Sequence, residues 1–191
     1  MVHRFGAVLA IAMLAGVLVF VPAAAGDGLE ATPPSGLYEW HAGDDFLAAF
    51  NPLLSPAVAM SRGGERIEIR AMGTLSPALK LAEGGGTFVR SDEAGNVIAS
   101  GTLHVIELVT FQSFGSGSDQ GFPEFFEGGF AMIRVHLQPA SGGPGENAVL
   151  RVDCALGKAP PGQAEGVRLS ILGGPNFNRS VSGGTLFLRI E

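Results

Sequence analysis

The chain has 191 residues, a formal net charge of −6 and a sequence pI near 5.2. Charged residues make up 16% of the chain, which is below the quarter or so that is usual in globular proteins. An acidic, weakly charged chain is poorly suited to bind nucleic acid or an anionic membrane surface, so both classes of partner are excluded.

Residues 1–25 have the pattern of a secretory signal peptide. A basic start at Met1–Arg4 precedes an uncharged apolar run, Phe5–Val21, and Ala23–Ala25 provides small residues for cleavage. We therefore expect an exported protein, either secreted or extracytoplasmic in a bacterium, without a membrane segment after cleavage. A membrane anchor is the alternative interpretation, because the apolar run is close to the shortest length that spans a bilayer.

Residues 26–36 are small and polar and predict a flexible leader. Residues 37–191 are long enough for a single domain with a substantial core. Cys154 is the only cysteine, so no intramolecular disulfide can form and packing must supply the stability. Because Cys154 alternates with Leu150 and Val152, we expect its thiol to lie in the core. Thiol chemistry or a disulfide-linked dimer is the alternative.

Only one short helix is predicted. Asp44 has the residue type and position of an N-cap for a helix over Phe46–Phe50, and Asn51-Pro52 should end it. Two later segments share the sequence Leu-Ser-Pro-Ala, at 54–57 and 75–78, each followed by glycines. We expect both to form β-hairpins, with turns at Gly63-Gly64 and at Gly84–Gly86.

The rest of the chain consists of short alternating runs separated by turn residues. Turns are expected at 92–96, 141–146 and 173–184, because these segments are rich in Gly, Asn, Asp and Ser. The sequence therefore predicts an all-β fold: a single antiparallel barrel or sandwich of about nine short strands in meander-like hairpins, with at most one short helix near 44–50.

The period of two also predicts which side chains face the core. They are Ile67, Ile69, Ala71, Ile133, Val135, Leu137, Leu150, Val152, Cys154, Val167, Leu169, Ile171, Leu186, Leu188 and Ile190. Arginines and acids occupy most alternate positions, which predicts a solvated outer face with cross-strand ion pairs. A guanidinium-lined face that binds an anionic or sugar ligand is the alternative.

No catalytic or metal-binding motif is present: the chain has no nucleophile elbow, dinucleotide fingerprint or calcium loop. His41, His104 and His136 are not spaced as metal ligands. His104 and Glu107, three residues apart on a strand, should face opposite sides. His136 and Asp153 should lie on the outer faces of consecutive strands, where they can meet as a solvated pair. We therefore expect no catalytic residue, metal or cofactor.

The segment Phe111–Phe130 contains six of the thirteen phenylalanines among several glycines. A loop of this composition is normally solvated, yet phenyl rings favour burial. We expect the loop to close one end of the sheet, either as a plug, as one wall of an apolar pocket, or as an exposed adhesive patch. The candidate ligand-binding residues are Phe111, Phe114, Phe122, Phe125 and Phe126, with Glu124 or Glu127 as the polar group.

These observations predict an exported, non-enzymatic β-domain that binds a small apolar ligand at the end covered by residues 111–130. The alternative is a structural or protein-interaction module of the cell envelope that takes no small ligand. A third interpretation is a barrel enzyme without a recognisable motif.

Overall fold

The computed structural model describes residues 35–191. The predicted signal peptide and nearly all of the predicted leader lie outside the described residues. Between residues 35 and 191, no helix has the length and apolar character needed to cross a bilayer.

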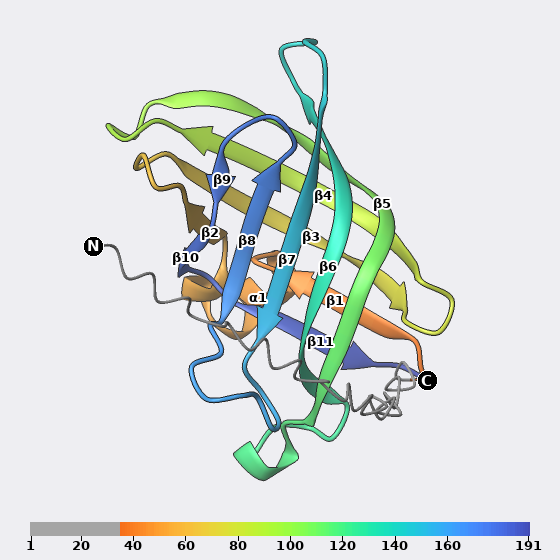
Figure 1. Ribbon diagram of the computed structural model, residues 1–191. Coiled ribbons are helices and arrows are strands. Elements are labelled where there is room, and N and C mark those ends of the chain that lie inside the picture. Colours follow the sequence, from red (N-terminus) through yellow and green to blue (C-terminus); the bar gives the residue numbers. More distant parts are fainter. Residues whose placement is uncertain (1–34) are drawn as a thin grey trace, which may run out of the picture. The chain divides into compact units, whose positions relative to one another are not determined.

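The described residues form one antiparallel sheet of eleven strands, which confirms the all-β prediction (Figure 1). The strands are β1 (Tyr38–Ala42), β2 (Ala57–Met60), β3 (Arg66–Ser76), β4 (Leu81–Ser91), β5 (Val97–Ser116), β6 (Phe126–Pro139), β7 (Glu146–Cys154), β8 (Gly166–Ile171), β9 (Asn176–Phe177), β10 (Arg179–Ser182) and β11 (Thr185–Arg189). The helical elements are α1 (Asp45–Phe50) and the single 3-10 turns η1 (Pro52–Leu54) and η2 (Ser118–Gln120). The short helix near 44–50 is therefore present as predicted.

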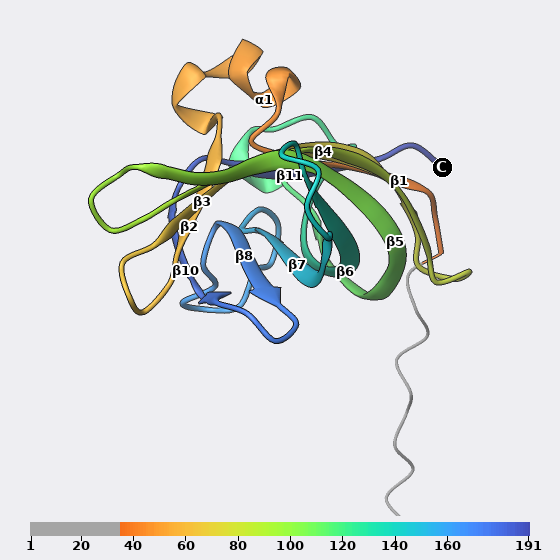
Figure 2. The same cartoon turned by 90° about the horizontal axis from the view of Figure 1, so that it is seen from above.

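The sheet closes on itself. Strands β3, β4, β5 and β6 pair in sequence, β6 also pairs with β11, β11 with β1, and β1 with β3. This circuit of hydrogen-bonded strands is a barrel rather than a sandwich. In Figures 1 and 2, β5 to β8 form one wall, β1, β3 and β11 cross behind it, and α1 lies outside.

The predicted turn at Gly84–Gly86 is wrong, because these glycines lie inside β4. The turn is instead at Pro77–Lys80, where the Lys80 amide donates to the Pro77 carbonyl at 3.2 Å. A Cβ on Gly86 would lie 1.9 Å from the Arg70 carbonyl oxygen, and one on Gly73 would lie 1.9 Å from that of Glu83. The glycines therefore permit β3 and β4 to approach closely where they curve.

Strand β5 contains three irregularities that strict alternation could not predict. Its register with β6 shifts between Val105 and Glu107, between Leu108 and Thr110, and between Ser113 and Gly115. Each bulge inserts one residue and reverses the sidedness of those that follow.

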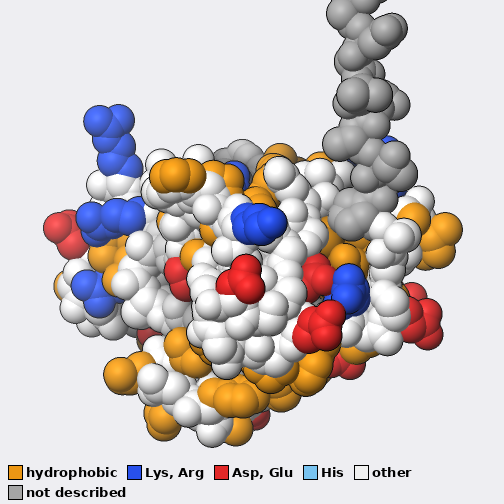
Figure 3. Space-filling model, turned by 90° about the horizontal axis from the view of Figure 1, so that it is seen from below, with side chains coloured by type: hydrophobic (Ala, Val, Ile, Leu, Met, Phe, Trp, Pro, Cys, Tyr) orange, Lys and Arg blue, Asp and Glu red, His pale blue; other side chains and the backbone are white. Residues whose placement is uncertain are grey.

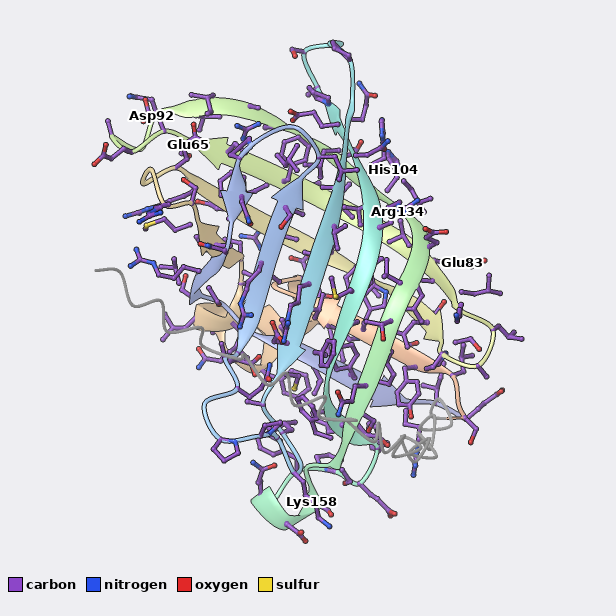
Figure 4. All side chains as sticks on the ribbon, viewed as in Figure 1. Glu65, Glu83, Asp92, His104, Arg134 and Lys158 are labelled. Carbon is purple, nitrogen blue, oxygen red and sulfur yellow. The ribbon has the colours of Figure 1, made fainter. Side chains whose placement is uncertain are left out.

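The first bulge overturns one prediction about His104. Because of this bulge, His104 and Glu107 face the same side of the sheet. They pair across the strands with His136 and Arg134, respectively. Glu107 forms an ion pair with Arg134 at 3.0 Å. Figure 4 shows Arg134 and His104 near each other beside β5 and β6.

The predicted meeting of His136 and Asp153 is also wrong. His136 lies opposite Asn147 and binds its side chain at 2.9 Å, whereas Asp153 lies opposite Phe130 near the other end of β7. Asp153 is 1% exposed and is held by Arg151 at 2.8 Å and by Gln163 at 2.6 Å. The two strands pair with an offset that the sequence does not reveal.

The predicted core faces of β3, β6, β7 and β8 are confirmed, and Cys154 is buried with them. Strand β11 differs: Phe187 is fully buried, Leu186 and Leu188 are also buried, and Ile190 is exposed. Trp40 lies opposite Phe187, and His41 lies opposite Leu186. Leu186 and Leu188 therefore share the face of His41 rather than that of Trp40. Leu186 and Leu188 are buried in the hydrophobic core as predicted, although they lie on the face of β11 opposite to Phe187. The prediction for Ile190 is wrong, because Ile190 follows the end of β11 and is exposed.

Candidate functional site

The short helix α1 is fixed against the outer face of β1 by a small polar network. Asp44 Oδ1 accepts from the Leu47 amide at 3.2 Å and caps the helix, while Asp44 Oδ2 accepts from His41 Nδ1 at 2.6 Å. The His41 ring stacks on Phe46, with centroids 4.3 Å apart. Asp44 thus serves as the N-cap of α1 and also links α1 to β1 through His41. In this position α1 covers the outer face of the neighbouring β11.

The Phe-rich segment is shorter as a loop than its composition predicted. Strand β5 continues to Ser116 and β6 starts at Phe126, so only residues 117–125 are irregular or in η2. Phe126 is buried on β6, whereas Phe122 and Phe125 are 45% and 51% exposed.

Phe126 is the centre of an aromatic cluster that joins this loop to α1. Its ring centroid lies 6.1 Å from that of Phe50, 6.2 Å from that of Phe122 and 5.1 Å from that of Phe125. Two of the three contacts are edge-on, which is a favourable geometry for phenyl rings. Residues far apart in the sequence are therefore brought to one side of β11.

A pocket of about 220 Å³ lies between α1, η1, the loop of residues 117–125 (the Phe loop) and the start of β11. Its apolar lining consists of Leu47, Phe50, Leu54, Phe122, Phe126, Cys154, Leu156 and Leu186. Gly184, Thr185 and Glu165 complete the lining. Hydrophobic side chains also gather at the lower edge of the end-on surface view (Figure 3).

Glu165 carries the one ionisable carboxylate among these lining residues. Its oxygens accept from the Ala155 amide at 2.7 Å, from the Thr185 amide at 2.9 Å and from Thr185 Oγ at 2.6 Å. The residue as a whole remains accessible to solvent, but burial of its carboxyl raises the pKa, and the three hydrogen bonds oppose that rise. The carboxylate is thus fixed in orientation at the pocket wall.

Cys154 contributes an inert wall rather than a nucleophile. It is 2% exposed, and burial raises its pKa to about 12, with Glu165 adding to the rise. A thiol that stays protonated at neutral pH does not attack an electrophile. The pocket therefore offers a surface for binding, with no activated nucleophile among the residues that line it.

The structure separates the seven predicted ligand-binding residues. Phe122 and Phe126 line the pocket. Phe111 packs inside the barrel, with its ring centroid 5.1 Å from that of Phe187, and Phe114 packs near Phe130 at 6.3 Å. Phe125 and Glu124 border a different hollow beside Arg189.

Glu127 faces the barrel interior instead of the pocket. It is 3% exposed, accepts from Ser113 Oγ at 2.7 Å and lies 3.4 Å from the Arg189 guanidinium. At the opposite end, the Arg90 guanidinium lies 3.5 Å from Glu65, 3.4 Å from Glu146 and 5.7 Å from the Phe177 ring. An arginine paired with glutamate thus stands at each end of the barrel.

The interior itself is filled by large side chains, among them Trp40, Phe88, Phe177 and Phe187, each at most 2% exposed. Within residues 35–191, no group of three His, Cys, Asp or Glu residues could hold a metal ion. The apolar lining of the pocket beside α1 makes it the candidate site for an apolar ligand.

Sequence reasoning missed most of this pocket. The helix prediction placed Leu47 and Phe50 on α1 but named no residues that pack against them. No pattern connected α1 with Leu156, Glu165 or Leu186, because those contacts are set by how β11 crosses the barrel.

Searches against protein-family models, curated proteins and solved structures found no match to this chain. The function must therefore be inferred from the geometry of the site.

Proposed function

We propose that this protein is an exported, non-enzymatic binding domain that takes a small apolar ligand in the pocket between α1, the Phe loop and β11. The supporting observation is the pocket itself, whose lining is apolar apart from the polar atoms of Glu165 and Thr185. Apolar pockets with a few oriented polar groups are the usual form of small-molecule sites.

The pocket size restricts the ligand. Its volume of about 220 Å³ is below the ~300–1,000 Å³ of pockets for drug-sized molecules. It exceeds the roughly 150 Å³ of an engineered apolar cavity that holds benzene. A single substituted ring or a short alkyl chain fits these limits, and a long fatty acid does not.

The partly exposed rings support a binding role over a purely structural one. Phe50 is 60% exposed and Phe122 is 45% exposed, although both border the pocket. Buried aromatic side chains contribute more to stability than exposed ones. A ligand seated between the two rings would remove apolar surface from water that the folded chain leaves accessible.

Calorimetric titration with a series of linear alcohols, from butanol to octanol, tests this function. Affinity should rise by about fourfold for each added CH₂ that is buried, and then level off when the chain exceeds the pocket. Native mass spectrometry of the purified protein should also show any apolar ligand that it retains.

Phe122→Ser and Phe125→Ser form a matched pair for the same titration. Both rings are on one loop and are similarly exposed, but only Phe122 lines the pocket. We expect Phe122→Ser to abolish the dependence on chain length and Phe125→Ser to preserve it. Equal loss in both variants, or no alcohol binding to the parent protein, would count against the proposed function.

A further inference from the structure

The charge and lining of the pocket indicate which class of apolar ligand it takes. Three phenyl rings, those of Phe50, Phe122 and Phe126, border the same space as the Glu165 carboxylate. Within the described part of the chain, no lysine, arginine or histidine lines this pocket. Aromatic faces carry partial negative charge and attract organic cations, and a carboxylate adds a full charge of the same sign.

We propose that the pocket selects an organic cation, an alkyl or aryl ammonium, over neutral and anionic molecules of the same size. This inference rests on the proposed function, because it names the ligand class of the same pocket. The apolar body would lie against the leucine side chains and the rings, and the ammonium would face Glu165.

The hydrogen bonds around Glu165 favour the charged form of the carboxylate. All three of its partners can donate: the Ala155 amide, the Thr185 amide and Thr185 Oγ. A carboxylate accepts such bonds at both oxygens, and the two amides, which can only donate, favour this charged form, whereas the Thr185 hydroxyl can donate or accept. The orientation of Glu165 is therefore fixed without a cation from the protein.

The nearby charged groups do not neutralise Glu165. Asp153, the adjacent acid, forms ion pairs with Arg151 at 2.8 Å and with Arg168 at 3.6 Å. These two arginines therefore pair with Asp153 and not with Glu165. Cys154 remains an uncharged thiol at neutral pH, since its pKa is raised to about 12. The formal net charge of −6 for the whole chain further favours a cationic ligand.

Three probes of equal chain length separate this inference from the proposed function: hexylammonium, 1-hexanol and hexanoate, titrated calorimetrically at pH 7 and low salt. Hexylammonium should bind at least about tenfold more tightly than hexanol, as expected for a hydrogen bond to a charged group. Hexanoate should bind more weakly than hexanol. Hexanol binding as tightly as hexylammonium would overturn the inference and leave the proposed function standing, whereas no binding by any probe would overturn both.

Glu165→Gln tests the role of the carboxylate, because it keeps the shape and removes the charge. The preference for hexylammonium should fall to within about twofold of hexanol. A preference retained in folded Glu165→Gln would overturn the inference.

If this variant does not fold, a pH series on the parent protein provides the same test. Protonation of Glu165 at low pH should remove the preference, since hexylammonium keeps its charge and hexanol has none. A preference that persists after the carboxyl is protonated would overturn the inference. Phe122→Ser is the control for location: hexylammonium binding that survives it would arise at other acidic residues and would also overturn the inference.

Discussion

Replacing Leu186 by alanine tests whether the outer face of β11 is covered as described. Leu186 is 4% exposed, yet it shares the face of His41, away from the barrel interior. A buried Leu→Ala change typically costs ~2–5 kcal/mol, of which part comes from the cavity that it leaves. Because Leu186 already borders a pocket of about 220 Å³, it lacks neighbours on one side. We therefore expect a loss of about 2–3 kcal/mol in the free energy of unfolding.

Urea unfolding followed by the fluorescence of Trp40 measures this loss. Trp40 is the only tryptophan and is fully buried, so its emission reports on the barrel interior. Leu172→Ala is the matched control, because Leu172 is 63% exposed and should change stability by less than ~0.5 kcal/mol. If both variants lose equally little, α1 and the Phe loop do not cover β11 and the pocket has no inner wall.

Three further predictions concern the barrel and its buried groups. Gly86→Ala should lower the free energy of unfolding in urea by more than ~2 kcal/mol, because its Cβ would lie 1.9 Å from a carbonyl oxygen of β3. Gly143→Ala is the control and should be nearly neutral, since its Cβ would have nothing within 4 Å. Equal losses in the two variants would contradict the close approach of β3 and β4. Absorbance titration of Tyr38, the single tyrosine, should show a pKa above its usual 10.0, chiefly because of burial and then because of the nearby Glu127 carboxylate. Glu127→Gln should lower the pKa of Tyr38. An ordinary pKa in the parent protein would contradict the burial of Tyr38 beside Glu127. At pH 8, iodoacetamide should label Cys154 about a thousandfold more slowly in the folded than in the urea-unfolded protein. The reason is that a pKa of about 12 in place of 9.0 lowers the thiolate fraction by that factor. Fast labelling of the folded protein would contradict burial of the thiol.

The fold could be predicted from the sequence where one face of a strand is apolar and the other is wet. The runs Ile67–Ala71, Ile133–Leu137 and Leu150–Cys154 alternate without interruption, and their core faces are as predicted. The rule fails at β5, where three bulges reset the sidedness, and at β11, where Leu186 and Phe187 are both buried. Neighbours outside the strand decide those cases, and no local pattern encodes them.

The site was harder to predict for a related reason. Composition identified the segment Phe111–Phe130, and two of its rings, those of Phe122 and Phe126, line the pocket. Glu124 and Glu127, the nearest acids in the sequence, point elsewhere, and Glu165 supplies the carboxylate at the pocket wall. Because the loop 155–165 returns to β11 only in the folded chain, sequence spacing does not indicate that Glu165 and Phe122 line the same pocket.

Mapping of amide chemical shifts during titration with 1-hexanol is the most direct test that a ligand enters the space between α1, the Phe loop and β11. The largest shifts should occur at Leu47, Leu156 and Leu186, which lie on three separate segments of the chain and share this pocket. Shifts centred on Arg189 and Glu124 at the neighbouring hollow, or small shifts spread evenly over the surface, would contradict it.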